Sequence, residues 1–258
     1  MSLAGFSLQN KTALVLGASS AIGRAAALAL AEAGADVAVS TTLATQREEL
    51  ALKDCQEKIR ALGKKSLAQT IDAAREADVQ TLITRTVSEL GALNILVNAH
   101  DLPFAKPFAD ITPREWQRVL EVNLTGVYLA CRAAAEPLLS HGDSGRIINI
   151  VSLLGERGMI NGSVYCAAQA GVLNLTRALA LEWARSGITV NAIGAGWTEG
   201  MGLLKDAHMQ EQLVRYLPHK RLAQPHEIGE AAVYLASDKS GFITGQTVWI
   251  EGGALSHL

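Results

Sequence analysis

The stretch TALVLGASSAIGR, residues 12–24, decides the fold of this chain. Its first residues are apolar or β-branched and predict a buried strand, and the alanine-rich residues that follow predict a helix. Between them, Gly17 and Gly23 permit a tight turn and a close approach of the backbone to a pyrophosphate. The N–H groups and the dipole at the start of the helix favour the phosphate charge. A glycine-rich loop by itself is an ordinary connection, but this one joins the first strand to the first helix, so it predicts a dinucleotide-binding turn.

The rest of the chain repeats the alternation of strand and helix that this first unit begins. Long crossovers between apolar strands require a parallel sheet with helices on both faces. The expected fold is therefore a doubly wound, seven-stranded α/β sheet of the Rossmann type. The predicted strands are residues 12–17, 36–40, 66–71, 94–97, 146–151, 188–193 and 246–250, and the predicted helices are residues 21–33, 43–62, 75–90, 112–139, 163–185 and 225–236.

Length and composition agree with one enzyme-sized domain. The 258 residues are 49% hydrophobic and 19% charged, with a formal net charge of -2, and they contain no repeat, linker or charge block. We therefore expect one domain spanning residues 1–258, a small-molecule partner and no nucleic-acid contact. Residues 194–220 break the alternation after the sixth strand and are the expected substrate lid.

Neither a membrane segment nor an export signal is expected. The N-terminal residues MSLAGFSLQNK have no basic region followed by an apolar one, and charged or polar residues interrupt the longer apolar stretches. Cys55, Cys131 and Cys166 lie far apart without metal-binding spacing, which predicts neither a disulfide nor a metal site. A redox role for Cys166 is the alternative to a small packed thiol. These features together predict a cytoplasmic protein.

The end of the second predicted strand bears on the choice between NAD and NADP. An acidic residue there would bind the adenosine ribose of NAD, but the sequence reads Ser40-Thr41-Thr42. A 2′-phosphate would not be repelled there, and the two threonine hydroxyls, helped by Arg24 or Arg47, could accept it. The sequence therefore favours NADP(H) over NAD(H).

Several motifs, in one order along nearly the whole chain, resemble the short-chain dehydrogenase/reductase family. They are the glycine turn with Ala21, the pair Asn98-Ala99, Asn123, Ser152 with Tyr165 thirteen residues later, and the C-terminal stretch RLAQPHEIGEAAVYLASDKSGFITGQTVWIEGG. The C-terminal stretch is similar to the β-ketoacyl-carrier-protein-reductase-like branch. The resemblance implies the strand order 3-2-1-4-5-6-7 and a homotetramer assembled through the helices at 112–139 and 163–185 and the C-terminal strand.

The resemblance also implies catalytic roles for Ser152, Tyr165, Asn123 and the residue four positions after the tyrosine. Ser152 would orient a substrate carbonyl and Tyr165 would donate or remove a proton, at the sheet edge where ligands bind. In the family a lysine follows the tyrosine by four residues, but this chain has Gln169 at that position. Asn123 matches an asparagine that, in the family, supports a proton relay to the lysine. Without that cation we expect the pKa of Tyr165 near its ordinary value of about 10, so that oxidation suffers most at neutral pH. Gln169 could still bind ribose hydroxyls.

The matching positions define the candidate cofactor site. The expected contacts are Gly17, Ser19, Ser20, Ile22, Gly23, Thr41, Thr42, Asp72, Asn98, Ala99, Tyr165, Gln169, Gly196 and Thr198. Asp72 would accept a hydrogen bond from the adenine amino group, and an ordinary helix cap is the alternative for it.

The expected substrate contacts follow the same strand ends. They are His100, Leu153, Arg157 and Trp197, with Met159 and Met201 as further lining residues. His100 would reach the substrate or replace part of the missing positive charge, and a loop histidine paired with Asp101 is the alternative. Arg157 would meet an anionic group or stay exposed.

Three functions are compatible with these residues. The first is an NAD(P)(H)-dependent oxidoreductase that interconverts a ketone and a secondary alcohol by hydride transfer. The second, motivated by Gln169, is a cofactor-binding regulatory partner with little or no turnover. The third is a redox-neutral dehydratase or isomerase that uses the pocket around His100 and Tyr165.

Overall fold

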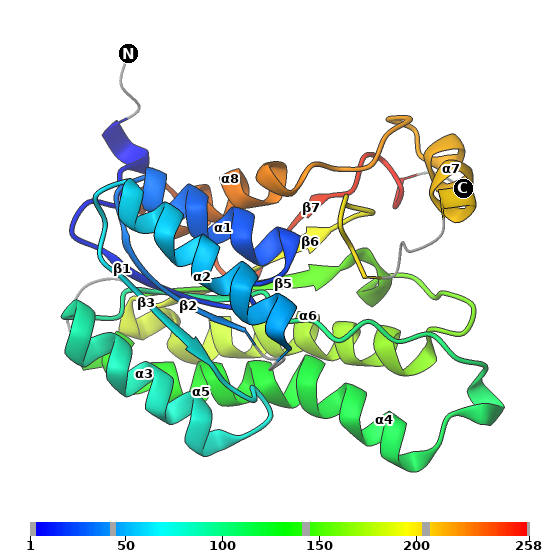
Figure 1. The fold of residues 1–258 in the computed structure, drawn as a ribbon, viewed down its shortest axis with the longest axis horizontal. Helices are drawn as coiled ribbons and strands as arrows, with labels where there is room; N and C mark the ends of the chain where they lie inside the picture. Colours follow the sequence, from blue (N-terminus) through cyan, green and yellow to red (C-terminus); the bar gives the residue numbers. More distant parts are fainter. Residues whose placement is uncertain (1–3, 42–44, 141–144, 203–206, 257–258) are drawn as a thin grey trace.

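The computed structural model describes residues 4–41, 45–140, 145–202 and 207–256 (Figure 1). Its seven strands form one sheet in the order β3-β2-β1-β4-β5-β6-β7, with every neighbouring pair parallel. The strands are β1 (Thr12–Leu16), β2 (Asp36–Thr41), β3 (Ser66–Thr70), β4 (Ile95–Asn98), β5 (Arg146–Ser152), β6 (Thr189–Ala195) and β7 (Thr247–Ile250). This topology confirms the predicted doubly wound Rossmann sheet and its strand order.

Helices cover both faces of the sheet, as Figure 1 shows. One face carries α1 (Ala21–Glu32), α2 (Gln46–Ala61) and α8 (Pro225–Ala236). The other carries α3 (Glu76–Leu90), α4 (Pro113–Leu120), α5 (Gly126–Ser140) and α6 (Ser163–Trp183). In the part of the chain that the structure describes, no helix is both long and apolar enough to cross a membrane.

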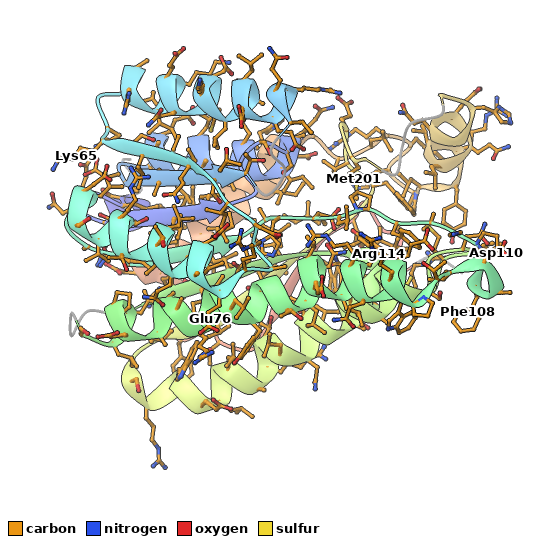
Figure 2. All side chains as sticks on the ribbon, turned by 60° about the horizontal axis from the view of Figure 1, so that its bottom comes forward. Lys65, Glu76, Phe108, Asp110, Arg114 and Met201 are labelled. Atoms are coloured by element: carbon orange, nitrogen blue, oxygen red, sulfur yellow. The ribbon has the colours of Figure 1, made fainter. Side chains whose placement is uncertain are left out.

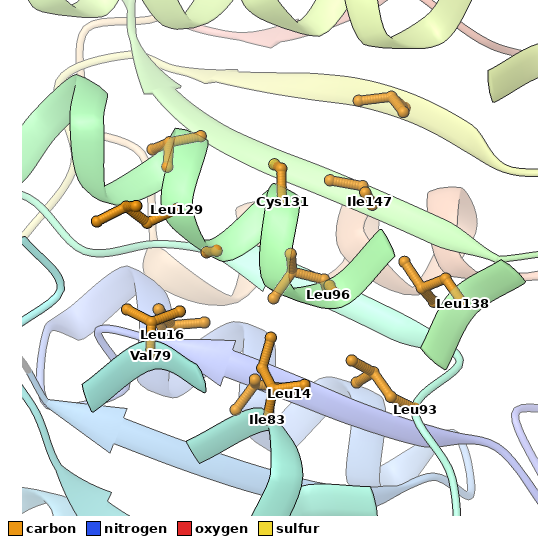
Figure 3. Packing of buried hydrophobic residues seen from close by; sticks show 14 of the residues in the cluster. Leu14, Leu16, Val79, Ile83, Leu93, Leu96, Leu129, Cys131, Leu138 and Ile147 are labelled. Atoms are coloured by element: carbon orange, nitrogen blue, oxygen red, sulfur yellow. The ribbon is translucent and has the colours of Figure 1, made fainter. Parts of the chain in front are cut away.

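The two faces of the sheet explain why β1 is buried along its whole length. In β1, Ala13 and Val15 pack with α1, α2 and α8, whereas Leu14 and Leu16 pack with α3, α5 and α6. Figure 3 shows Leu14 and Leu16 among the side chains of this second layer. Because successive strand residues point to opposite faces, a strand buried on both sides has no polar alternation.

Two segments differ from the sequence predictions. The helix predicted over residues 112–139 is divided into α4 and α5 by a π-helical segment, Glu121–Thr125, a local widening that is frequent at functional sites. Within the expected lid, residues 207–216 form a helix, α7 (Ala207–Tyr216), that the sequence pattern did not predict. Figure 1 places α7 at the end of the molecule toward which the β5 arrow points.

Candidate functional site

The turn after β1 packs closely against neighbouring backbone at its two glycines. Gly17 has a φ of 85°, and a Cβ on it would lie 2.5 Å from the backbone nitrogen of His100. A Cβ on Gly23 would overlap the carbonyl oxygen of Gly17. The Ser20 hydroxyl donates to that carbonyl (2.8 Å) and accepts from the Gly23 N–H (3.0 Å), which caps α1. Two glycines before and within the first turn of a helix, at positions where neighbouring backbone leaves no room for a side chain, fit the turn that binds the pyrophosphate of a dinucleotide.

Beside this turn, two hydroxyl groups meet at the end of β2. The Oγ of Ser19 and the Oγ1 of Thr41 are 2.7 Å apart. Thr42 lies outside the described residues. Arg24 forms an ion pair with Asp54 of α2, so its guanidinium is directed toward that helix. Arg47 is exposed in the first turn of α2.

Asp72, after β3, has protein partners for both carboxylate oxygens. Its Oδ1 accepts the N–H of Ala74 at 3.0 Å, and its Oδ2 lies 3.6 Å from the guanidinium of Arg118. The first of these contacts closes a local turn before α3, whose N-cap residue is Arg75, so Asp72 is not the helix cap that was the alternative to an adenine contact.

The side chain of Asn98 is turned into the protein interior. Its Nδ2 donates to Asn149 Oδ1 at 2.8 Å, and Asn149 Nδ2 in turn donates to Thr176 Oγ1 at 2.9 Å. This buried polar chain links β4, β5 and α6, so only the backbone of Asn98 and Ala99 faces the turn after β1. The Ala99 N–H donates to the Leu16 carbonyl at 2.9 Å.

The turn after β6 is closely packed. A Cβ on Gly196 would lie 2.5 Å from the Cα of Glu251, and the hydroxyl of the buried Thr198 donates to the Gly196 carbonyl at 3.0 Å. Gly200 approaches the glycine turn, since a Cβ on it would lie 2.9 Å from the Cβ of Ala21. The segment that begins the expected lid therefore lies against the start of α1.

Ser152 and Tyr165 meet at the carboxyl end of the sheet. Ser152 ends β5 and Tyr165 stands in the first turn of α6, and both are buried. Burial and the nearby Asp101 carboxylate raise the pKa of Tyr165 well above its ordinary value, and a hydrogen bond with Ser152 only partly opposes them. The expectation of a tyrosine pKa near 10 is therefore wrong, because it considered the missing cation and neither the burial of the phenol nor this carboxylate.

Gln169 uses both ends of its amide within the site. Its Oε1 accepts the Ser152 N–H at 2.9 Å, and its Nε2 donates to Asp101 Oδ1 at 3.4 Å. The side chain is buried and carries no charge. Gln169 therefore ties the end of β5 to the loop after β4. The ribose contact expected of Gln169 stays a prediction.

Asp101 is the functional candidate that the sequence reasoning missed. It was considered only as a partner for His100, but its side chain lies beside Tyr165 and Gln169. Burial raises the pKa of this carboxyl group to about 6, although a hydrogen bond from Tyr165 lowers it. Its position was the available signal, because it lies in the loop after the carboxyl end of β4, at the edge where open α/β sheets bind ligands.

His100 does not supply the missing positive charge. Its side chain is buried, with Nε2 directed at Gly126, where an added Cβ would come within 2.9 Å. Burial lowers the pKa of His100 to about 4, and the neighbouring backbone of Val122, which raises it, does not offset this. The ring is therefore neutral at pH 7, which contradicts the expectation of a substituted cation.

Asn123 lies in the π-helical segment and clamps the backbone that follows Asp101. Its Oδ1 accepts the Leu102 N–H at 2.8 Å and its Nδ2 donates to the Leu102 carbonyl at 3.0 Å. The amide of Asn123 thus fixes the loop after β4.

The side chains around Tyr165 are mainly apolar. Leu153 and Leu154 are buried with it, and Met159, Cys166 and Trp197 pack against this cluster. Trp197 also lines a pocket of about 320 Å³ between the turn after β6 and β7. Met201, labelled in Figure 2, lies farther along the same turn, where its sulfur accepts the Thr198 N–H at 3.2 Å.

Arg157 is held by the protein. Its Nη1 donates to the Ala254 carbonyl at 2.9 Å, and its guanidinium lies 5.8 Å from the ring centre of Tyr216 in α7. The arginine therefore joins the loop after β5 to α7 and the C-terminal segment. Over the described ranges, no cluster of side chains suited to a metal ion is found.

Known proteins similar to this chain are dehydrogenases and reductases. A family model described as enoyl-(acyl carrier protein) reductase matches residues 17–254. The 2-dehydro-3-deoxy-D-gluconate 5-dehydrogenase of Escherichia coli is 32% identical over 100% of both chains. The 3-oxoacyl-(acyl-carrier-protein) reductase FabG of Staphylococcus epidermidis is 36% identical over 95% of this chain and 98% of its own length.

The fold is also similar to solved structures. A gluconate 5-dehydrogenase from Burkholderia cenocepacia, solved in complex with NADP and tartrate, has 32% sequence identity and a TM-score of 0.91, with 100% of both chains covered.

Proposed function

This chain belongs to the short-chain dehydrogenase/reductase family, and on that premise we propose that it uses NADP(H) to interconvert a partly apolar ketone and its secondary alcohol. As a member of this family it is an NAD(P)(H)-dependent oxidoreductase, as the sequence predicted. The observation that carries the proposal is the meeting of Ser152 and Tyr165 at the carboxyl end of the sheet that also holds the glycine turn.

Each part of the site has a role in this proposal. The bound nicotinamide supplies or accepts the hydride. The turn from Gly17 to Gly23 holds the pyrophosphate, Ser152 orients the carbonyl oxygen, and Tyr165 exchanges a proton with it. Gln169 holds Ser152 and Asp101 in register, and Asn123 fixes the loop after β4.

The preference for NADP(H) rests on the end of β2. The Ser19 and Thr41 hydroxyls meet there, and β2 ends without the carboxylate that would select an unphosphorylated ribose. The Burkholderia relative compared above was solved with NADP, which agrees with this preference.

The preference for a partly apolar substrate rests on the side chains beside Tyr165. Leu153, Met159 and Trp197 offer apolar surface, and the guanidinium of Arg157 is bound to Ala254 and Tyr216. We therefore expect neutral ketones to react better than sugar acids, because a carboxylate would find no free cation from Arg157.

Three organisational features belong to the same proposal. The chain acts as one domain, residues 194–220 close over the substrate, and four copies assemble through α4 and α5, through α6 and through β7. The exposed Leu181 on α6 would be covered in such an assembly. Analytical ultracentrifugation tests the tetramer, and a monomer at micromolar concentration would contradict it.

Titration of NADPH and NADH by fluorescence, followed by assay of a ketone and alcohol panel from pH 5 to 9, tests the proposed activity. We expect tighter NADPH binding and oxidation of NADPH in the presence of neutral ketones. Tight binding without turnover across the panel would instead favour the cofactor-binding regulatory partner.

A further inference from the structure

We propose that Asp101 is the proton partner of Tyr165 and exchanges with the phenol the proton that the substrate gains or loses. The inference rests on the proposed function, since it assumes that Tyr165 exchanges a proton with the substrate. It assigns the control of Tyr165 to a carboxyl group, because the position four residues after the tyrosine holds Gln169 and not lysine. Asp101 is then a positioning residue that acts through Tyr165.

Two elements hold Asp101 in place. From α6, Gln169 Nε2 donates to its Oδ1 at 3.4 Å, while Gln169 Oε1 accepts the Ser152 N–H at the end of β5. From the π-helical segment, Asn123 bonds both backbone groups of Leu102, the next residue along the chain. The carboxyl group therefore lies at a defined position beside the phenol.

Among the residues that the structure describes, no cation compensates the charge of this pair. From α6, Tyr165 and the Cys166 thiol are the titratable groups that act on the pair, and Ser152 faces it from β5. Within the described ranges, no lysine or arginine shifts the pKa of either partner. His100, the preceding residue, is neutral and turned toward Gly126. The pair therefore carries one negative charge when Asp101 is ionised and none when it is protonated.

This charge count fixes the proton path in each direction. In reduction, the Tyr165 proton passes to the carbonyl oxygen, the Asp101 carboxyl proton passes to the phenolate, and Asp101 takes a proton from water. In oxidation, the alcohol proton passes to Tyr165 as the phenol proton passes to the Asp101 carboxylate, which later releases it to water. Reduction must begin with protonated Asp101, because an ionised carboxylate beside the new phenolate would place two negative charges side by side. Oxidation must begin with ionised Asp101, because only the carboxylate can accept the phenol proton.

The two directions therefore have opposite pH dependence. Because the pKa of Asp101 is about 6, reduction should lose about tenfold in kcat/KM for each pH unit above that value. Oxidation should rise with pH up to about the same point and then level off. A tyrosine activated by a cation would give no acid group near this pH.

The first experiment needs no turnover. The carboxyl group of Asp101 is followed by carbon-13 NMR in the cofactor-free protein, with Asp101→Asn used to identify its signal. We expect its midpoint near pH 6 in the native chain and at higher pH in Tyr165→Phe, because the phenol hydrogen bond lowers the pKa of Asp101. An unchanged midpoint in Tyr165→Phe would overturn the coupling.

The second experiment uses the pH profile. In Asp101→Asn, reduction should fall at least tenfold at pH 6 and lose its dependence on pH between 5 and 8, with the NADPH dissociation constant unchanged within threefold. Asp101→Glu should restore the pH dependence. A loss of rate with the native pH dependence retained would mean a merely structural role and would overturn the proposal. If no ketone in the panel reacts, the proposed function fails, and the NMR titration still decides whether the two groups share a proton.

Discussion

Replacing Gln169 by lysine should convert the site from carboxyl to cation control of Tyr165. In the native chain the Asp101 pKa of about 6 leaves about one molecule in eleven protonated at pH 7. If reduction requires that form, it runs at about a tenth of its maximum rate there. Gln169 Nε2 lies 3.4 Å from Asp101 Oδ1, so an ammonium group at the same place would pair with the carboxylate and cancel its charge beside Tyr165.

The gain should therefore depend on pH in a defined way. Measured as kcat/KM for NADPH-dependent reduction, Gln169→Lys should equal the native protein at pH 5, exceed it about tenfold at pH 7 and about a hundredfold at pH 8. Part of the gain could be hidden by a stability loss of about 1–3 kcal/mol, because the buried Ser152 N–H loses its acceptor.

A matched control separates charge from this lost hydrogen bond. Gln169→Met removes the same acceptor and adds no cation. Its kcat/KM should therefore be lower than that of the native protein by the same factor at every pH. A Gln169→Lys to native rate ratio that stayed constant from pH 5 to 8, in a folded protein with native NADPH affinity, would refute the reasoning.

Three further predictions concern the cofactor turn and the stability of the site. Gly23→Ala should weaken NADPH binding more than tenfold and destabilise the fold by about 1–3 kcal/mol, because the added Cβ overlaps the Gly17 carbonyl. Gly158→Ala is the control, because Gly158 has open space around it, and it should change neither NADPH binding in titrations nor stability in urea unfolding. Thr41→Asp should weaken NADPH binding at least tenfold more than NADH binding, and the neutral Thr41→Asn, titrated in parallel, should not. The pKa of His100 is about 4 in the folded protein and about 6.5 in the unfolded chain, so His100 should withdraw roughly 3 kcal/mol of stability as the pH falls through that range. Urea unfolding of His100→Gln should lack this contribution, so that the variant gains stability relative to the native protein as the pH falls.

Asp101 should act on stability in the opposite sense to His100. Its folded pKa of about 6 lies above its ordinary value, so its contribution is present at low pH and is lost as the pH rises through that range. The two neighbours therefore compensate each other between about pH 4 and 6.5. The free energy of unfolding of the native protein should therefore change little over this pH range. It should rise with pH in Asp101→Asn, where His100 remains, and fall with pH in His100→Gln, where Asp101 remains.

The features that could be predicted from the sequence are those that depend on residues close together along the chain. A strand, a glycine turn and a capped helix are local, so Gly17, Ser20 and Gly23 indicated the fold and the cofactor from a dozen residues. Helix α7 was missed because its surroundings are rich in glycine and histidine and its apolar pattern is short.

The electrostatics of the site could not be predicted in the same way. The contact between Gln169 and Asp101 joins residues 68 positions apart, and no local pattern reports that distance. The prediction for Tyr165 used only the residue one helical turn away, so it identified the missing cation correctly and missed the added carboxylate. His100 attracted attention as a titratable ring, yet burial makes it neutral.

Positions 101 and 169 are best understood as one unit. A lysine at 169 beside Asp101 would form a buried ion pair, and a glutamine at 169 without Asp101 would leave Tyr165 with no ionisable partner near neutral pH. With both residues present, the neutral amide can hold Ser152 and the carboxyl group together without fixing the carboxyl in its charged form. The glutamine therefore does not by itself indicate a dead enzyme. It moves the control of proton exchange from a cation, which is charged at every physiological pH, to a carboxyl group that titrates near 6.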